Sequence, residues 1–401
     1  MSPRLNLLAP EVRANPYPHY AELRRTAPVC QVDPGGLWAV SRYDDVIAVL
    51  KNPQLFSSEG MRRATCPPWF EEAPFAQSMI VQDPPEHGRL RVLVNRAFGP
   101  AALSRLEPWV RQRCQTLVEQ LPAEQPLDLI DAFTRPLPAS VIGELLGLEA
   151  SLQPLFKRWA DDLTSVSSVA PGDTARKEEI RSTAREARQH LTEALAQRRR
   201  SPGEDMLSDL LATRVEGEAL TEPELMSFLF LLLIAGMETT IHLLNHSVRL
   251  LMEYPEVLAR VRANPSLLPK LVEEVLRYEP PVHAIMRVTT AETELSGVRL
   301  PQGAWVMAML ASASRDETRF PHSERFELER PGPQNLPFGH GVHFCLGAPL
   351  ARLEARLGLE ALLSRFSGFA PRGPVTWNHS LSVRGPRVLP VELFPSTSTY
   401  R

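Results

Sequence analysis

The sequence predicts one mainly α-helical domain with a minor β portion, extending over residues 1–401. Three observations predict it. Hydrophobic residues recur at helical spacing through most of residues 129–279. A single apolar helix of about 32 residues, roughly 48 Å long at 1.5 Å per residue, follows Leu220. Strand-like alternation is concentrated in residues 285–310, and no internal repeat or low-complexity linker divides the chain.

The elements on either side of the long helix follow from local patterns. Most are amphipathic helices, and the remainder are short strands bounded by glycine or proline. The expected helices are 17–26, 44–50, 86–119 with a break near Gly99, and 347–366; the expected strands are 29–32, 37–41 and several short ones within 370–394. Residues 57–80 are expected to be irregular. The arginine-rich stretch 175–200 mixes both charge signs, which is typical of a solvent-facing helix surface.

The long helix has clear ends. Thr221 and Glu224 have the spacing of a capping box, and Pro223 suits a first turn. Pro255 ends the helix after Tyr254. A helix this long and this apolar in its first half must pass through the centre of a large core.

Composition excludes several classes of function. The 44 basic residues against 47 acidic ones give a net charge of −3, which argues against a nucleic-acid-binding protein. The four cysteines form no CxxC pair and no disulfide framework, so a reducing cytoplasm is expected. The N-terminus lacks a signal-peptide pattern. The longest apolar run, 228–235, is too short to span a membrane, so no membrane association is expected.

Residues 338–347, FGHGVHFCLG, carry the sharpest chemical signal. Cys345 lies on a glycine-rich loop directly before a helix, where the helix dipole and free backbone N–H groups favour a thiolate. Glycines allow a flat, bulky group to approach the backbone, and a thiolate is a soft ligand suited to iron. The plain alternative is a buried structural cysteine, but the full ten-residue pattern favours a ligand.

This loop resembles the haem-binding signature of the cytochrome P450 family, Phe-x-x-Gly-x-His/Arg-x-Cys-x-Gly. The chain matches it at Phe338, Gly341, His343, Cys345 and Gly347, and the resemblance extends over nearly the whole chain. It implies the P450 fold, with the long helix over the haem and a smaller β-rich lobe. It also implies haem b as cofactor, Cys345 as its thiolate ligand, and a cofactor contact at Gly339 in the same loop.

The segment AGMETT, residues 235–240, interrupts the apolar helix. Ala235 and Gly236 remove side-chain bulk, which would let a cofactor lie against the backbone. Glu238 and Thr239 place an acid and an alcohol in apolar surroundings. Burial of a carboxylate there is costly unless it is paired or has a chemical function. The alternative is a solvent-facing Glu238 and a Thr239 that bonds back to a carbonyl. The resemblance implies that O2 binds here and that this pair, as catalytic residues, delivers protons to it.

Two further groups of residues gain a role from the resemblance. Glu274 and Arg277 share a helix face, and with Arg330 from a later loop they match a buried structural network. As a surface pair they would mean little. The resemblance also implies four donors for the two haem propionates, where a basic solvent-facing helix is the alternative: His87, Arg91, Arg287 and His343.

Substrate contacts are expected, by family position, from apolar residues that would otherwise be ordinary core: Met61, Trp69, Phe75, Met79, Leu231, Leu232, Val282, Ile285, Met286 and Leu381. They predict a mainly apolar substrate, such as a fatty acid, a terpenoid or a polyketide. The predicted function is a monooxygenase that inserts one atom of O2 into a C–H bond or forms an epoxide.

No dinucleotide-binding glycine fingerprint is present, so the resemblance implies electrons from a separate ferredoxin or flavodoxin with its reductase. Arg96, Arg352 and Arg356 are candidate docking residues for that acidic partner, unless they are ordinary surface arginines. Two alternatives stay open: a peroxygenase driven by hydrogen peroxide, and a haem-thiolate sensor without turnover. The Glu238–Thr239 pair argues against both.

Overall fold

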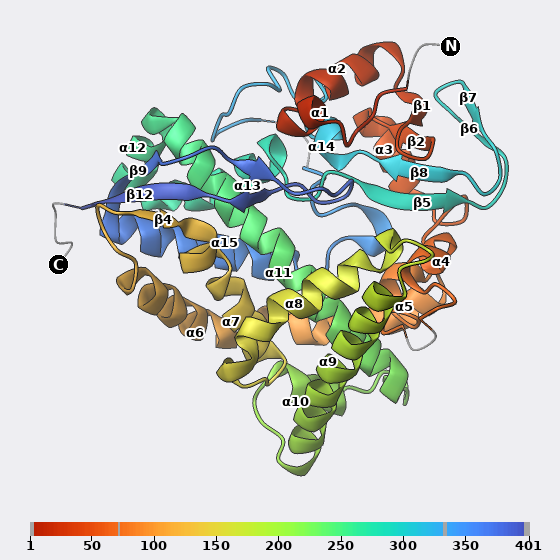
Figure 1. Ribbon diagram of the computed structural model, residues 1–401, viewed down its shortest axis with the longest axis horizontal. Helices are drawn as coiled ribbons and strands as arrows, with labels where there is room; N and C mark the ends of the chain where they lie inside the picture. Colours follow the sequence, from red (N-terminus) through yellow and green to blue (C-terminus); the bar gives the residue numbers. More distant parts are fainter. Residues whose placement is uncertain (1–3, 71–72, 332–334, 397–401) are drawn as a thin grey trace.

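A computed structural model describes residues 4–70, 73–331 and 335–396. It confirms a mainly helical protein with a smaller β portion. The helices surround one long helix, α11 (Glu222–Glu253), which crosses the centre of the molecule (Figure 1). The predicted capping box is present: the Thr221 hydroxyl accepts from the Glu224 N–H, and the Glu224 carboxylate accepts from the Thr221 N–H.

α11 is a core helix. By length and composition alone it could cross a membrane, but 61% of its most apolar window is buried inside the protein. Among the other α-helices, it packs most extensively against α7 (Pro136–Leu145), α13 (Leu268–Tyr278) and α15 (Ala348–Arg365). Burial of this apolar surface is the main source of stability in this part of the fold.

A five-stranded sheet forms the β-rich lobe beside α2 (Tyr17–Thr26) and α3 (Tyr43–Lys51) (Figure 1). Its order is β1-β2-β8-β5-β3, and only β2 and β8 pair in parallel. The strands come from distant parts of the chain: β1 (Val29–Val32), β2 (Leu37–Val40), β3 (Phe56–Ser57), β5 (Ile285–Thr289) and β8 (Trp305–Ala308).

The remaining helices cover α11. The larger ones are α5 (Glu86–Asn95), α6 (Pro100–Glu119), α8 (Gln153–Thr164), α9 (Thr174–Arg200), α10 (Met206–Ala212) and α12 (Pro255–Ala263). The short ones are α1 (Pro10–Ala14), α4 (Arg62–Thr65), α14 (Leu310–Ala313), the π-helical turn η4 (Ile130–Thr134), and the 3-10 turns η1 (Glu59–Met61), η2 (Met79–Val81), η3 (Arg96–Phe98), η5 (Ala150–Leu152), η6 (Ser165–Ser168), η7 (Pro265–Leu267) and η8 (Gly341–His343). The arginine-rich helix α9 keeps a buried stripe that includes Ile180, Ala187 and Leu191.

Three small sheets complete the β portion. β4 (Pro126–Asp128), β12 (Pro390–Pro395) and β9 (Phe366–Pro371) form one of them, in that order. The others are hairpin-like pairs: β6 (Thr293–Leu295) with β7 (Val298–Leu300), and β10 (Thr376–Trp377) with β11 (Pro386–Val388).

Candidate active site

The cysteine loop is held in one shape by backbone contacts. The Cys345 N–H donates to the Phe338 carbonyl at 2.9 Å, which closes the loop before α15 begins at Ala348. Gly341 has a φ of +72°, and a Cβ there would lie 2.5 Å from the carbonyl oxygen of Leu50 at the end of α3. Glycine is therefore required at this position, both for its conformation and for the approach of α3.

The environment of Cys345 does not favour a thiolate by itself, although the sequence predicted that it would. Burial raises its pKa, and this outweighs the opposing effects of the Gly347 and Ala348 N–H groups and of Arg91 and Arg352. The helix start is present, as predicted, but desolvation of the charged form dominates. A bound metal ion removes such a proton outright, so the buried thiol with two donors aimed at it fits a metal ligand.

Gly347 and Gly339 serve the loop in different ways. A Cβ at Gly347 would meet no atom within 4 Å, so the backbone beside Cys345 presents a bare face. Gly339 has a φ of +75°, and a Cβ there would lie 3.4 Å from Cδ1 of Ile285 on β5. Gly347 thus has the cradle expected for a flat cofactor, while Gly339 serves the turn.

The centre of α11 keeps one open stripe. Ala235 is exposed, although most residues of this helix are buried. Leu231, Ile234, Glu238 and Thr239 are partly exposed at offsets of −4, −1, +3 and +4 from it, so they share that helix face. The stripe combines an apolar surface with the acid and the alcohol, as expected for a helix lying over a cofactor.

Gly236 has a packing role that the sequence analysis did not predict. A Cβ at this position would lie 2.4 Å from Cδ1 of Ile142, so the glycine lets α7 pack closely against α11. Sequence reasoning attributed the missing side chain to a cofactor because a helix–helix contact and a ligand contact leave the same residue pattern. Ala235, on the exposed stripe, keeps its predicted place.

Glu238 and Thr239 are held differently. The Thr239 hydroxyl donates to the Ala235 carbonyl one turn earlier at 3.0 Å, as the alternative interpretation expected. Glu238 is 41% exposed, and its Oε1 lies 3.7 Å from Nε2 of His242. His242 is a residue that the sequence analysis missed, although its spacing of four from Glu238 was a signal for contact on one helix face.

Four predicted donors come together on the other side of the loop. The rings of His87 and His343 lie 4.0 Å apart, and both histidines interact electrostatically with Arg91 and Arg287. Burial and the neighbouring cations lower the pKa of His343 to about 3. Burial lowers the pKa of Arg287 to about 10, although Asp83 opposes it.

This cluster fits an anionic ligand. His87 Nε2 is buried with no hydrogen-bond partner among the described residues, and Arg287 donates from Nη1 only to the neighbouring Met286 carbonyl there. Ser58 and Asp83, which sequence reasoning did not single out, support it. Ser58 contacts His343 Nε2 at 3.0 Å, and Asp83 accepts from the Ser58 N–H. Two carboxylates would supply the negative charge that these buried donors lack.

The predicted structural network is confirmed. Arg277 donates to both oxygens of Glu274 at 2.7 and 2.8 Å, and Arg330 Nε donates to Glu274 at 3.4 Å. Both residues of the first pair are almost fully buried. Arg277 also donates to the carbonyls of Ser314, Ser323 and Arg325, so it holds α13 to the following loop.

The predicted pocket residues fall into separate apolar clusters. Phe75, Met79 and Leu232 are buried in the main core. Leu231 lies on the open stripe, and Ile285 faces the cysteine loop. Partly buried positions hold the other residues: Met61, Trp69, Val282, Met286 and Leu381.

Trp69 departs from the expectation of an apolar wall. It lines a cavity of about 400 Å³ with three arginines of α9. The Arg181 guanidinium lies 5.7 Å from its ring centroid and donates to its carbonyl oxygen at 3.1 Å. The cavity beside Trp69 is therefore lined by cationic side chains.

Two of the three predicted docking arginines are already paired. Arg352 donates to Glu273 at 2.5 and 3.1 Å, and Arg356 donates to Glu107 at 2.8 Å. Arg96 is exposed at the end of α5. The intramolecular carboxylates reduce the positive charge that the first two present to a partner.

Comparisons with known proteins identify a family for nearly the whole chain. The family profile described as Cytochrome P450 matches residues 5–380. Cytochrome P450 109 of Bacillus spizizenii is 40% identical over 358 residues, covering 88% of this chain and 84% of that protein. Erythromycin C-12 hydroxylase of Saccharopolyspora erythraea is 40% identical over 347 residues, covering 86% and 85%. The structure of cytochrome P450 CYP109Q5 from Chondromyces apiculatus superposes with a TM-score of 0.91 at 39% identity, covering 99% and 100%.

Proposed function

The chain belongs to the cytochrome P450 family and is a monooxygenase, and on this premise we propose that it hydroxylates or epoxidises an apolar substrate with O2. The observation that carries the proposal is Cys345, a buried thiol with two backbone N–H groups aimed at it beside the bare face of Gly347. We further propose that residues 1–401 act as a single domain.

The proposed cofactor is haem b, and each part of it has residues to hold it. Cys345 is its thiolate ligand, with contacts from Phe338 and Gly347 in the same loop, while Gly339 supplies the turn with its positive φ. His87, Arg91, Arg287 and His343 hold its propionates, and Ala235 faces it from α11. Bound haem supplies the redox chemistry that activates O2 once electrons arrive.

We propose that two side chains of α11, Glu238 and Thr239, supply protons to the reaction. Glu238 would pass protons on from its carboxyl oxygens, and the Thr239 hydroxyl, which donates to the Ala235 carbonyl, would accept a hydrogen bond from a water on the same helix face. General acids placed in this way contribute about 10²–10⁴-fold to rate. The presence of this pair disfavours a peroxygenase, which would take both electrons and protons from hydrogen peroxide.

The proposed substrate is a polyketide or terpenoid with a large apolar surface. The hydroxylase of erythromycin among the relatives supports the polyketide class. Within the site, Leu231 on the open stripe and Ile285 beside the loop offer apolar contacts. A fatty acid is the other candidate, because the arginines of α9 beside Trp69 suit a carboxylate.

The proposed electron donor is a separate ferredoxin or flavodoxin with its reductase, in the cytoplasm. Arg96 is the docking residue we favour, because it is exposed and lies on the helix end that follows Arg91. Replacement of Arg96 by Glu should raise the KM for a surrogate ferredoxin several-fold at low salt and leave substrate binding unchanged. Arg105→Glu, which breaks an outer pair with Asp209, serves as the matched charge control.

The experiment that tests the function is the carbon monoxide difference spectrum of the dithionite-reduced protein. Wild type should give the strongly red-shifted Soret band of a thiolate ligand, and Cys345→Ala should lose it. Substrates are then screened by the spin-state shift of the ferric protein. A wild type without haem, or with an unshifted band, would contradict the proposal. Product formation that depends on ferredoxin would exclude the sensor and the peroxygenase.

A further inference from the structure

We propose that His242 is a positioning residue that hands protons to Glu238. The inference rests on the proposed function, because it concerns the acid on the open stripe of α11. Nε2 of His242 lies 3.7 Å from Glu238 Oε1, and the histidine itself is buried. A carboxyl group that gives up its proton in each turnover must regain one, and this imidazole is the nearest titratable group recorded beside it among the described residues.

The second ring nitrogen of His242 makes the relay possible. Nδ1 is buried and has no hydrogen-bond partner among the residues that the structure describes. A Cβ at Gly385 would lie only 2.0 Å from Nδ1, so a residue without a side chain is needed there to make room for the His242 ring. A buried imidazole nitrogen without a partner is costly and calls for a water or a role in proton transfer.

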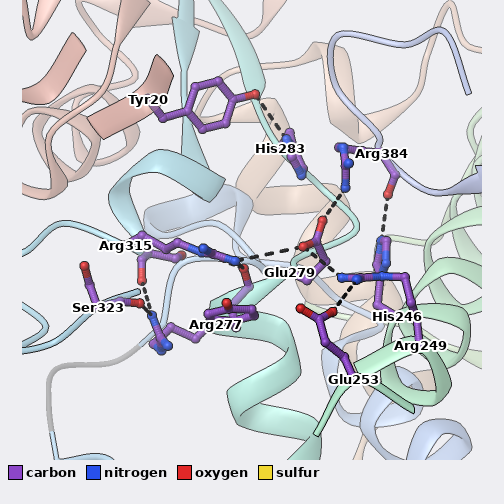
Figure 2. A network of polar contacts seen from close by, with 12 residues as sticks. Tyr20, His246, Arg249, Glu253, Arg277, Glu279, His283, Arg315, Ser323 and Arg384 are labelled. Carbon is purple, nitrogen blue, oxygen red and sulfur yellow. Dashed lines mark hydrogen bonds and ion pairs between the residues drawn. The ribbon is translucent and has the colours of Figure 1, made fainter. Parts of the chain in front are cut away.

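His246 extends the arrangement by one helical turn. Its ring centroid lies 6.3 Å from that of His242, and its Nδ1 is also without a partner in the described part of the chain. Its Nε2 lies 3.0 Å from the Arg384 carbonyl, beside the ion pair of Arg384 and Glu279 (Figure 2). Two orphaned nitrogens on one helix face suit a bridging water, which needs such polar partners.

The proposed step moves one proton and no electrons. His242 in its neutral Nε2–H form releases that proton to Glu238 Oε1, so the N–H bond breaks and an O–H bond forms. In the same step Nδ1 accepts a proton that solvent delivers as hydronium through the water on the side of His246, so that a neutral water, and not hydroxide, remains. Exchange with solvent then restores the starting tautomer.

The test compares wild type with His242→Gln, which keeps a polar side chain but removes proton exchange. His190→Gln is the matched control, because His190 lies 3.8 Å from Glu193 on an outer helix. With a surrogate ferredoxin, His242→Gln should keep the Soret band and the substrate KM. Its product yield per electron should fall about tenfold, and its solvent deuterium isotope effect should rise. His190→Gln should behave as wild type.

A second measurement does not depend on turnover. In the diamagnetic ferrous carbonmonoxy protein, the ring ¹⁵N signals of His242 should move when Glu238 is replaced by Gln, while those of His190 stay in place. Unchanged signals, or a His242→Gln variant with wild-type yield and isotope effect, would overturn the relay and leave the monooxygenase intact. A wild type lacking the thiolate Soret band would instead overturn the proposed function.

Discussion

Single residues in the cysteine loop divide into those that shape the backbone and those that leave a surface open. Gly341 has a positive φ and would clash with the Leu50 carbonyl if it carried a side chain. Gly347 has an ordinary φ of −81° and open space around it. Both glycines belong to the same signature, but only the structure separates a folding requirement from a binding surface.

Replacement of each glycine by alanine should therefore affect a different property: folding stability for Gly341, and haem binding for Gly347. Gly341→Ala should lower the free energy of unfolding by about 1–3 kcal/mol through backbone strain alone, and the Leu50 contact adds to this. Gly347→Ala should leave the unfolding of the cofactor-free protein nearly unchanged and reduce the haem content after reconstitution. Thermal unfolding and the haem-to-protein ratio measure the two effects. Equal destabilisation by both substitutions would contradict this division.

At the scale of elements, close contacts fix the position of α11 and of the helices packed around it. Gly236 allows the approach of α7, since Ile142 fills the space that a side chain would take. On α13, which also packs against α11, Arg277 donates to the carbonyls of Ser314, Ser323 and Arg325 and so joins this helix to the loop that follows. The two contacts show how the elements that carry the site are held by residues that do not touch it.

A double-mutant cycle tests the contact between α7 and α11. Gly236→Ala should destabilise the protein by about 1–3 kcal/mol, because the added methyl overpacks the core. Ile142→Val removes Cδ1 and should by itself cost about 0.5–1.5 kcal/mol. Together the two substitutions should cost less than their sum, since removal of Cδ1 from Ile142 frees the space that the added methyl takes. Additive values from urea unfolding would show that Gly236 is not required by Ile142.

Loss of the buried arginine should be more severe. Arg277→Ala leaves the Glu274 carboxylate uncompensated in the interior, which typically costs about 3–5 kcal/mol. The variant should unfold at much lower urea concentration or accumulate poorly. Arg260→Ala removes an exposed pair with Glu329 and should change stability by less than about 1 kcal/mol. A small effect of Arg277→Ala would mean that Arg330 alone neutralises Glu274.

At the scale of the whole molecule, one buried network joins segments that lie far apart in the sequence (Figure 2). Glu279, at the end of α13, pairs with Arg384 near the C-terminus and with Arg249 of α11. Arg384 also donates to the carbonyls of Arg13 and Ala14 at the N-terminus. Burial opposes ionisation of Glu279, but the surrounding arginines prevail and lower its pKa to about 2.

The network makes stability depend on pH. Burial lowers the pKa of His246 to about 3 in the folded protein, against about 6.5 in the unfolded chain. Above pH 6.5 both states are neutral and His246 contributes no pH dependence. As the pH falls below 6.5, only the unfolded chain takes up the proton, so stability falls by about 1.4 kcal/mol per pH unit down to about pH 3. Glu279 adds a further loss below about pH 4.3, when the unfolded carboxylate becomes protonated.

Replacement of His246 by Gln should flatten this dependence. The free energy of unfolding, measured in urea between pH 6 and 4, should fall by about 1.4 kcal/mol per unit less steeply than in wild type. His190→Gln, a partly exposed histidine outside the network, should keep the wild-type slope. An unchanged slope in His246→Gln would mean that this histidine is protonated in the folded protein.

The sequence by itself determined the helical class and the ends of α11. These follow from local rules, since caps and hydrophobic spacing depend on neighbouring residues. The roles of the cysteine loop and of the four donors for an anion came from the resemblance to a family, because the donors lie far apart in the sequence. Only the tertiary structure decided that Gly236 makes room for α7, that burial raises the pKa of Cys345, and that Arg352 and Arg356 are paired with carboxylates. Each of these depends on a residue far away in the chain, and on desolvation, which no local pattern encodes.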